Sequence, residues 1–325
     1  MNFSEIELDL KPIKPYFKWL TGHSQTLLGH VIPSPTFNLE TVFYELELAD
    51  GDVLGLHSYR GTLPYTVCLF HGLSGSHKSD YIQRTAIVAA NMGFSVVMVD
   101  HRGTESVHGK SKNPYQSGRG EDASEVVKFV RSKYLNDKII VAGFSMSGSI
   151  ILNMLCQRYG DVLPDYAITV NAPIDLESAS LKLKNGLNKI YDLRFYFLLK
   201  KMILQYDFKK RLPLMGTTYL VDDQFTSQMC AFKNAKDYYE QCSVKKYLHQ
   251  IKTPTFVLTS EDDPFIDFSD YQIAKWSGST HRTFVPVGGH MGYLQNFQKK
   301  DSNKVSSIRW LDHYFSTVFN KILNL

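Results

Sequence analysis

The spacing of apolar and polar residues predicts an alternation of strands and helices. Residues 67–70, 94–99 and 166–170 are short and almost uninterrupted apolar runs, which are typical of strands covered on both faces. Residues 80–92 and 121–134 instead carry their apolar residues at helical spacing. We therefore expect an α/β fold, in which a mostly parallel sheet has helices on both of its faces.

The pattern continues on either side of this central part. Residues 43–48 and 53–59 alternate partly between apolar and polar positions around an Asp-Gly turn, which predicts a β-hairpin. Towards the C-terminus, strands are expected at 255–259 and 281–287. In the last helix, apolar residues repeat at intervals of three and four, which predicts one buried face. These residues are Val305, Ile308, Leu311, Phe315, Val318 and Ile322.

The first part of the chain is predicted to be an arm. Four prolines interrupt residues 1–40, and proline prevents long regular elements. Phe17, Trp19 and Leu20 are the side chains expected to pin this N-terminal arm to the core.

A second irregular region follows the central strands. Between residues 175 and 249 no run resembles a central strand, and residues 191–206 have a helical pattern. An insertion of this length in an α/β pattern is usually a cap or lid over a functional site. The expected organisation is a core of residues 41–174 and 250–325 with a helical cap formed by residues 175–249.

A sharp turn between a strand and a helix is predicted at Ser145. A β-branched run ends at Gly143, the serine follows two residues later, and small residues lead into an apolar helix. Such an elbow exposes the serine hydroxyl and directs the N–H of the next residue, Met146, towards an oxyanion. Ser147 stands where the G-x-S-x-G pattern has its second glycine. A junction that is merely rich in small residues remains the alternative for this segment alone.

The ends of two later strands supply the partners that a serine nucleophile needs. Asp262 and Asp263 follow one strand and His290 follows the next, and functional side chains gather at such carboxyl ends. The order serine, aspartate, histidine is that of the α/β-hydrolases. His290 would accept the proton of Ser145, and the carboxylate would fix the histidine tautomer. Asp263 is preferred to Asp262 because Pro264 stiffens the turn directly after it.

The loop after residues 67–70 carries two further candidates. Leu73 is expected to provide the second N–H of an oxyanion hole, with His71 packed beneath the loop. His71 has no H-x-H or H-E-x-x-H partner, so we expect no metal site. The four cysteines form no C-x-x-C pair, so we expect neither metal ligation nor structural disulfides. No cofactor is expected.

Composition and charge exclude other classes of protein. A formal net charge of +4 over 325 residues is too slight to indicate a nucleic-acid partner. The first residues are polar and acidic rather than basic and then apolar, so we expect no signal peptide. No segment approaches the roughly 20 apolar residues of a membrane span. Cytoplasmic localisation is therefore the default expectation.

With these residues assembled, the chain resembles the YheT-like branch of the α/β-hydrolase superfamily, which includes phospholipase-like ABHD proteins of eukaryotes. The resemblance covers most of the chain and rests on Gly22-His23-Ser24-Gln25-Thr26, Ala49-Asp50-Gly51-Asp52, His71-Gly72-Leu73-Ser74-Gly75-Ser76, Asp100-His101-Arg102-Gly103, Tyr115-Gln116-Ser117-Gly118, Ala172-Pro173-Ile174-Asp175-Leu176, Tyr238-Tyr239 with Ser243, Asp262-Asp263-Pro264-Phe265 and Gly288-Gly289-His290-Met291-Gly292.

The resemblance implies Ser145 as nucleophile, Asp263 as the acid that orients the base and His290 as the base. It also implies hydrolysis of esters, with lipid or short- to medium-chain acyl esters as small-molecule substrates. Ser147 departs from the glycine that the branch usually has, and its hydroxymethyl group would crowd the elbow at a cost of about 1 kcal/mol.

Two other functions stay open at this point. An acyltransferase would use the same three residues with an acceptor other than water, and a binding protein could retain the fold with a relic site. A basic and apolar stretch at 200–204, followed by Lys209, Lys210 and Arg211, fits peripheral contact with an anionic membrane. An apolar face turned towards the site, with solvated lysines outside, is the simpler interpretation. The sequence indicates no oligomeric state.

Overall fold

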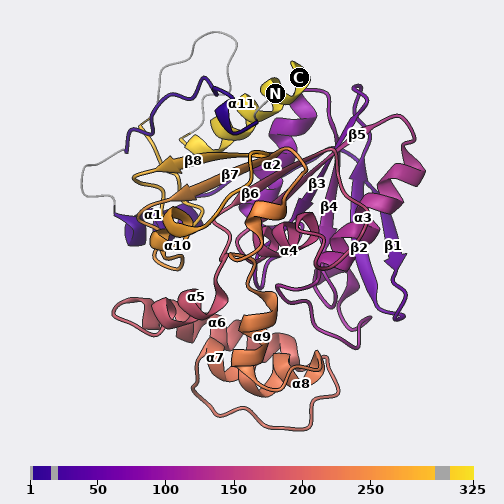
Figure 1. Ribbon diagram of the computed structural model, residues 1–325. Helices are drawn as coiled ribbons and strands as arrows, with labels where there is room; N and C mark the ends of the chain where they lie inside the picture. Colours follow the sequence, from indigo (N-terminus) through magenta and orange to yellow (C-terminus); the bar gives the residue numbers. More distant parts are fainter. Residues whose placement is uncertain (1–2, 16–20, 297–307) are drawn as a thin grey trace.

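The computed structural model describes residues 3–15, 21–296 and 308–325. This part of the chain forms one eight-stranded sheet in the order β1-β2-β4-β3-β5-β6-β7-β8 (Figure 1). The strands are β1 Val42–Glu47, β2 Val53–Tyr59, β3 Tyr65–Phe70, β4 Ser95–Asp100, β5 Lys138–Phe144, β6 Tyr166–Val170, β7 Thr255–Ser260 and β8 Thr280–Val285. Phe17, Trp19, Leu20 and Val305, which the sequence singled out, lie outside the described residues.

The sheet is mostly parallel, as the alternation of strands and helices predicted. The predicted hairpin is present, since β1 and β2 pair antiparallel with Val42 opposite Ser58. The pairing of β2 with β4 is also antiparallel. All other neighbours, from β4 through β3 to β8, pair in parallel.

Helices cover both faces of the sheet, because the central strands are apolar on both sides. Val67 and Leu69 of β3 belong to one buried cluster, together with residues of α2 (Asp80–Asn91) and α11 (Trp310–Leu323). Cys68 and Phe70 alternate with them and belong to a second cluster, with residues of α3 (Gly120–Lys133) and α4 (Met146–Leu155). The remaining short elements of the core are η1 Phe3–Glu5, η2 Glu105–Val107, η4 Leu248–Gln250 and α10 Phe268–Ile273.

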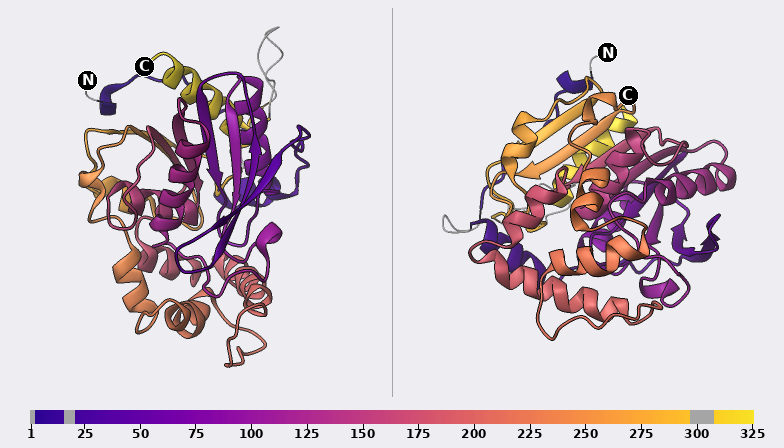
Figure 2. Two further views of the ribbon diagram at one scale, coloured as in Figure 1. Left: turned by 90° about the vertical axis from the view of Figure 1, so that its right-hand side faces the viewer. Right: turned by 60° about the horizontal axis from the view of Figure 1, so that its bottom comes forward.

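A group of helices lies at one end of the sheet, at the bottom of Figure 1 and in front in the right-hand view of Figure 2. They belong to residues 175–249, all of which are described and none of which form a strand. The elements are α5 Leu176–Leu183, α6 Asn188–Ile203, α7 Thr218–Val221, the π-helical turn η3 Asp222–Thr226, α8 Ser227–Met229 and α9 Ala235–Cys242. No helix of the described residues has the length and apolar character needed to cross a bilayer.

The N-terminal region contains a helix that the sequence did not predict, α1 (Gly22–Val31). Gln25 of this helix exchanges two hydrogen bonds with the backbone of Leu294, at 2.7 and 3.1 Å. Thr26 Oγ1 accepts a hydrogen bond of 2.8 Å from the backbone N–H of His290. The segment Gly22-His23-Ser24-Gln25-Thr26 therefore supports the loop that carries His290.

Candidate active site

Ser145 lies at the turn between β5 and α4, where the sequence predicted an elbow. Its φ of 52° and ψ of −122° are rare for any residue other than glycine, and such a conformation costs on the order of 1–3 kcal/mol. The flanking glycines allow close packing here. A Cβ on Gly143 would lie 2.5 Å from the carbonyl oxygen of Ser147, and one on Gly148 would lie 2.6 Å from Cβ of Ala172.

Ser145, His290 and Asp263 form one continuous chain of hydrogen bonds. Nε2 of His290 lies 2.9 Å from Oγ of Ser145, and Nδ1 lies 2.8 Å from Oδ2 of Asp263. Burial alone raises the pKa of the Asp263 carboxyl. His290 and hydrogen bonds from Phe265 N and Asn171 outweigh this effect and lower the pKa below its ordinary value. The carboxylate is thus held ionised next to the imidazole.

Asp262 has a different place from Asp263. Its Oδ1 accepts hydrogen bonds from the backbone N–H groups of Gly288 and Gly289, at 2.9 and 2.8 Å. Burial raises the pKa of Asp262, and these two bonds oppose that effect. The carboxylate that contacts His290 is therefore Asp263, while Asp262 holds the glycines that precede the histidine.

Asn171 is a residue of the site that the sequence analysis missed. It follows β6, and its Nδ2 donates to Oδ2 of Asp263 and, at 3.0 Å, to the carbonyl oxygen of Gly289. Its Oδ1 accepts a hydrogen bond from the Tyr293 hydroxyl. A φ of 48° suits asparagine better than most residues. The one available signal was its position at the carboxyl end of a predicted strand.

Leu73 and Met146, the expected oxyanion donors, border the same pocket as Ser145 and His290. The N–H groups on either side of Leu73 are occupied, because Gly72 donates to the Tyr81 hydroxyl at 2.9 Å and Ser74 donates to the Tyr115 hydroxyl at 2.8 Å. Within the described part of the chain, the N–H groups of Leu73 and Met146 have no acceptor. Both remain available for a ligand.

The sequence matches the α/β hydrolase fold family over residues 65–297, which is more than half of the chain. The chain belongs to this family. A similar protein is YheT of Escherichia coli (strain K12), described as a candidate esterase, with 26% identity over 293 residues that cover 84% of each chain. Phospholipase ABHD3 of Bos taurus is 25% identical over 313 residues, which cover 88% of this chain and 74% of that protein. The resemblance to the YheT-like branch is confirmed.

Solved structures agree on the fold of this α/β hydrolase. The Pyrococcus furiosus esterase Pf2001 superimposes with a TM-score of 0.58 and covers 98% of this chain and 99% of its own. The sequence identity is 16%, so this likeness concerns the fold alone.

Ser147, the residue that departs from the usual elbow pattern, turns away from the pocket. Its side chain is buried, and its Oγ lies 2.7 Å from Nε2 of His101 and donates to the carbonyl oxygen of His71. Burial lowers the pKa of His101 well below its ordinary value, so the ring is neutral and Nε2–H can donate to Ser147. The added hydroxyl therefore joins the elbow to the strand end that leads into Leu73.

His71 lies beneath the loop, with Nδ1 2.8 Å from the carbonyl oxygen of Gly72. A group spaced to hold a metal among the described residues is a different one, His57, His77 and Asp100, whose ligand atoms lie within 4.8 Å of one another. Asp100 already accepts bonds from the backbone N–H and Nδ1 of His77, both at 2.7 Å, and from Ser106 Oγ at 2.7 Å. These bonds give Asp100 a structural role in anchoring the loop after β3.

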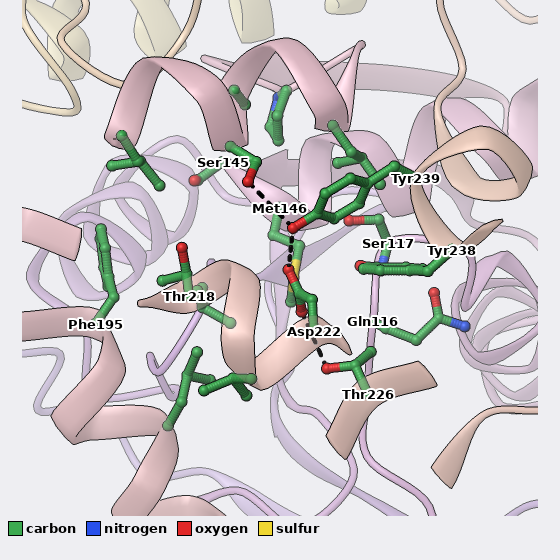
Figure 3. A pocket seen from close by; sticks show the side chains of 18 of the residues that line it. Gln116, Ser117, Ser145, Met146, Phe195, Thr218, Asp222, Thr226, Tyr238 and Tyr239 are labelled. Carbon is green, nitrogen blue, oxygen red and sulfur yellow. Dashed lines mark hydrogen bonds between the residues drawn. The ribbon is translucent and has the colours of Figure 1, made fainter. Parts of the chain in front are cut away.

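The pocket beside Ser145 lies between the turns that follow the strands and the helices of residues 175–249. Figure 3 shows some of the side chains that line it. Most of its wall is apolar, with Leu176 and Leu183 of α5, and Phe195, Leu199 and Met202 of α6 among the lining residues. A smaller polar part is lined by Ser180, Thr218, Asp222, Thr226, Tyr238 and Tyr239. A site of this shape can accept a mainly apolar molecule that carries a polar group.

Proposed function

We propose that this α/β hydrolase cleaves carboxylic esters of short- to medium-chain acyl groups or lipids through an acyl-enzyme on Ser145. The observation that carries the proposal is the uninterrupted contact from Ser145 Oγ through His290 to Asp263, at 2.9 and 2.8 Å. The apolar pocket wall next to Ser145 suits an acyl chain. Relatives described as a candidate esterase and as a phospholipase are consistent with this class of reaction.

In the first half-reaction, Nε2 of His290 takes the proton of Ser145 as Oγ attacks the ester carbonyl. Asp263 keeps the proton on Nδ1 and stabilises the imidazolium. The N–H groups of Leu73 and Met146 bind the oxyanion of the tetrahedral intermediate. When the intermediate collapses, the C–O bond to the alcohol breaks and His290 returns its proton to the leaving oxygen.

In the second half-reaction, water replaces the alcohol and His290 accepts a proton from it. Attack of this water on the acyl-enzyme releases the carboxylic acid and restores the Ser145 hydroxyl. Transfer to another alcohol would use the same acyl-enzyme. Adding glycerol as a competing acceptor and measuring the new ester against the free acid separates a hydrolase from an acyltransferase.

A fluorophosphonate probe tests the nucleophile directly. The wild type and the control Ser132→Ala, at an exposed helix position, should be labelled equally, and Ser145→Ala should not be labelled. A panel of p-nitrophenyl esters of increasing chain length then gives the acyl preference. Equal labelling of Ser145→Ala and wild type would contradict the proposal. Labelling of the wild type without turnover of any ester would favour a binding protein.

We further propose that residues 175–249 act as a cap and that their outer surface contacts anionic membranes. Leu204 after α6 and Leu214 are 82% and 86% exposed, and exposed apolar side chains rimmed by charged ones can mark a membrane contact. Part of the basic and apolar stretch points inward, since Met202 lines the pocket and Ile203 is buried. The exposed basic residues on the same segment are Lys201, Lys209, Lys210 and Arg211. Apolar and basic side chains together are what peripheral binding requires.

A further inference from the structure

The polar part of the pocket is organised around Asp222, which belongs to the π-helical turn η3. Its Oδ2 accepts a hydrogen bond of 2.7 Å from the Tyr239 hydroxyl, and its Oδ1 accepts one of 3.0 Å from Thr226 Oγ1. Figure 3 shows this chain from Tyr239 through Asp222 to Thr226 at the wall of the pocket. The Tyr239 hydroxyl also lies 3.3 Å from Ser180 Oγ.

Asp222 faces the pocket rather than the interior. It lines the same pocket as Ser145 and keeps partial exposure, although it lies deep enough for burial to raise the pKa of its carboxyl to about 6. An ionised carboxylate offers about four lone-pair sites, and the two hydroxyls occupy two of them. The remaining acceptor capacity is open to a molecule in the pocket.

The charge of Asp222 is not balanced by the protein. Among the described residues no lysine, arginine or histidine forms an ion pair with it. The charged groups that act on Asp222 are two further acids, Asp192 and Asp223, and both raise its pKa. A carboxylate in such surroundings is costly unless something brings it a donor or a positive charge. Its two hydrogen-bond partners, Tyr239 and Thr226, are neutral.

We propose that Asp222 forms a recognition site for a hydrogen-bond donor on the substrate, either a hydroxyl or a primary ammonium group, while the apolar wall holds the carbon chain. This inference rests on the proposed ester hydrolysis and specifies its substrate class. The same carboxylate disfavours substrates that end in a carboxylate or phosphate, because like charges repel more strongly beside an apolar wall than in bulk water.

The test compares esters of equal length that differ in one terminal group. In the acyl arm, the p-nitrophenyl esters carry hexanoyl, ω-hydroxyhexanoyl, ω-aminohexanoyl or ω-carboxyhexanoyl chains. In the alcohol arm, hexanoate is esterified to propanol, propanediol or aminopropanol. The two arms show which half of the ester reaches Asp222, and hydroxyl against amine shows which donor it takes.

In one of the arms, wild type should favour a donor-bearing ester over its alkyl counterpart by about tenfold or more in kcat/KM, as expected for a hydrogen bond to a charged group. Asp222→Asn should reduce this ratio to about threefold or less. The ratio is independent of how much of the variant is correctly folded. Tyr239→Phe should keep the preference, because the carboxylate remains.

Asp223→Asn is the matched control, since Asp223 is the adjacent acid but does not line the pocket. Its Oδ1 accepts from the Ala235 N–H at 3.0 Å, a bond that asparagine can keep, so the ratio and both rates should be unchanged. Absence of any donor preference in wild type, or equal effects of Asp222→Asn and Asp223→Asn, overturns the inference. Failure of the hydrolase proposal looks different, because no ester in either arm would then be cleaved.

Discussion

Asp263 and His290 are joined by a contact of 2.8 Å between Oδ2 and Nδ1, whereas the adjacent Asp262 binds the backbone of the loop that carries the histidine. Two neighbouring carboxylates thus act on one imidazole in different ways. In the proposed mechanism Asp263 fixes the histidine tautomer and stabilises the imidazolium that forms, whereas Asp262 holds the loop that carries the histidine.

This difference predicts unequal effects of the two amide substitutions. Asp263→Asn should lower kcat by about a thousandfold or more. An amide favours the wrong histidine tautomer and cannot stabilise the imidazolium. Asp262→Asn keeps an acceptor oxygen for both glycine N–H groups and loses only the negative charge, so it should cost about tenfold or less. Steady-state hydrolysis of a p-nitrophenyl ester measures both. Equal losses, or a larger loss in Asp262→Asn, would contradict the assignment of Asp263 as the acid.

Asn171 should be a positioning residue for Asp263. Asn171→Gly removes the bonds to Asp263 and Gly289 but tolerates the positive φ, so backbone strain does not confuse the result. We expect kcat to fall by about ten- to a hundredfold, with KM for a short ester unchanged, since the side chain does not line the pocket. A change in KM alone would indicate a role in substrate binding instead.

Removal of the Ser147 hydroxyl should destabilise the elbow. In Ser147→Gly the carbonyl oxygen of His71 and Nε2 of His101 lose a buried partner, which costs about 1–3 kcal/mol of the free energy of unfolding. Urea unfolding measures the loss, and Ser132→Ala serves as the control. If Ser147→Gly were instead faster and equally stable, the serine would be crowding the elbow as its sequence position first indicated.

The carboxyl of Asp222 should make stability depend on pH in a defined direction. Burial raises its pKa to about 6, so the folded chain binds more protons than the unfolded chain between about pH 4 and pH 6. The cost of this charge is fully present above pH 6 and fades as the pH falls. Wild type should therefore gain thermal stability relative to Asp222→Asn between about pH 7 and pH 5. Asp192, Asp223, Tyr238 and Tyr239 are present in both proteins, and a difference in Tm that stays constant would exclude this titration.

The proposed membrane surface can be tested with vesicles that contain phosphatidylserine. Leu204→Asp and Leu214→Asp together should lower the bound fraction in sedimentation by about tenfold or more, because two apolar contacts are lost and two negative charges are added. Leu135→Asp is the matched control, since Leu135 is 84% exposed but lies after α3. If the wild type does not bind these vesicles at low ionic strength, the membrane proposal is wrong and the lysines are simply solvated.

The central sheet could be predicted because its strands are buried on both faces and read as apolar runs. The run at 166–170 coincides with β6, and the ends of such strands pointed to Ser145, Asp263 and His290. Helix α1 could not be predicted in this way, because the residues it buries are Gly22, Gln25 and Gly29. These three residues are buried because the backbone approaches closely and hydrogen bonds form, and neither leaves an apolar periodicity in the sequence.

Asn171 and Asp222 show why the finer parts of the site are not visible in the sequence. Asn171 acts through contacts with residues more than ninety positions away, and a single asparagine has no recognisable spacing. Asp222 lies on a π-helical turn, whose extra residue disturbs the helical pattern. Its partner Tyr239 comes from α9, so only the packing of α9 against the π-helical turn brings the two side chains together.

The π-helical turn that presents Asp222 has an evolutionary consequence. Each helical residue accounts for a rotation of about 100°, so the loss of one residue between Asp222 and Thr226 would rotate the two side chains relative to each other and remove the threonine bond to this carboxylate. Ser145, His290 and Asp263 are carried by other elements and would stay in place. One deletion would thus give a related protein with the same three residues around Ser145 and a different ester specificity.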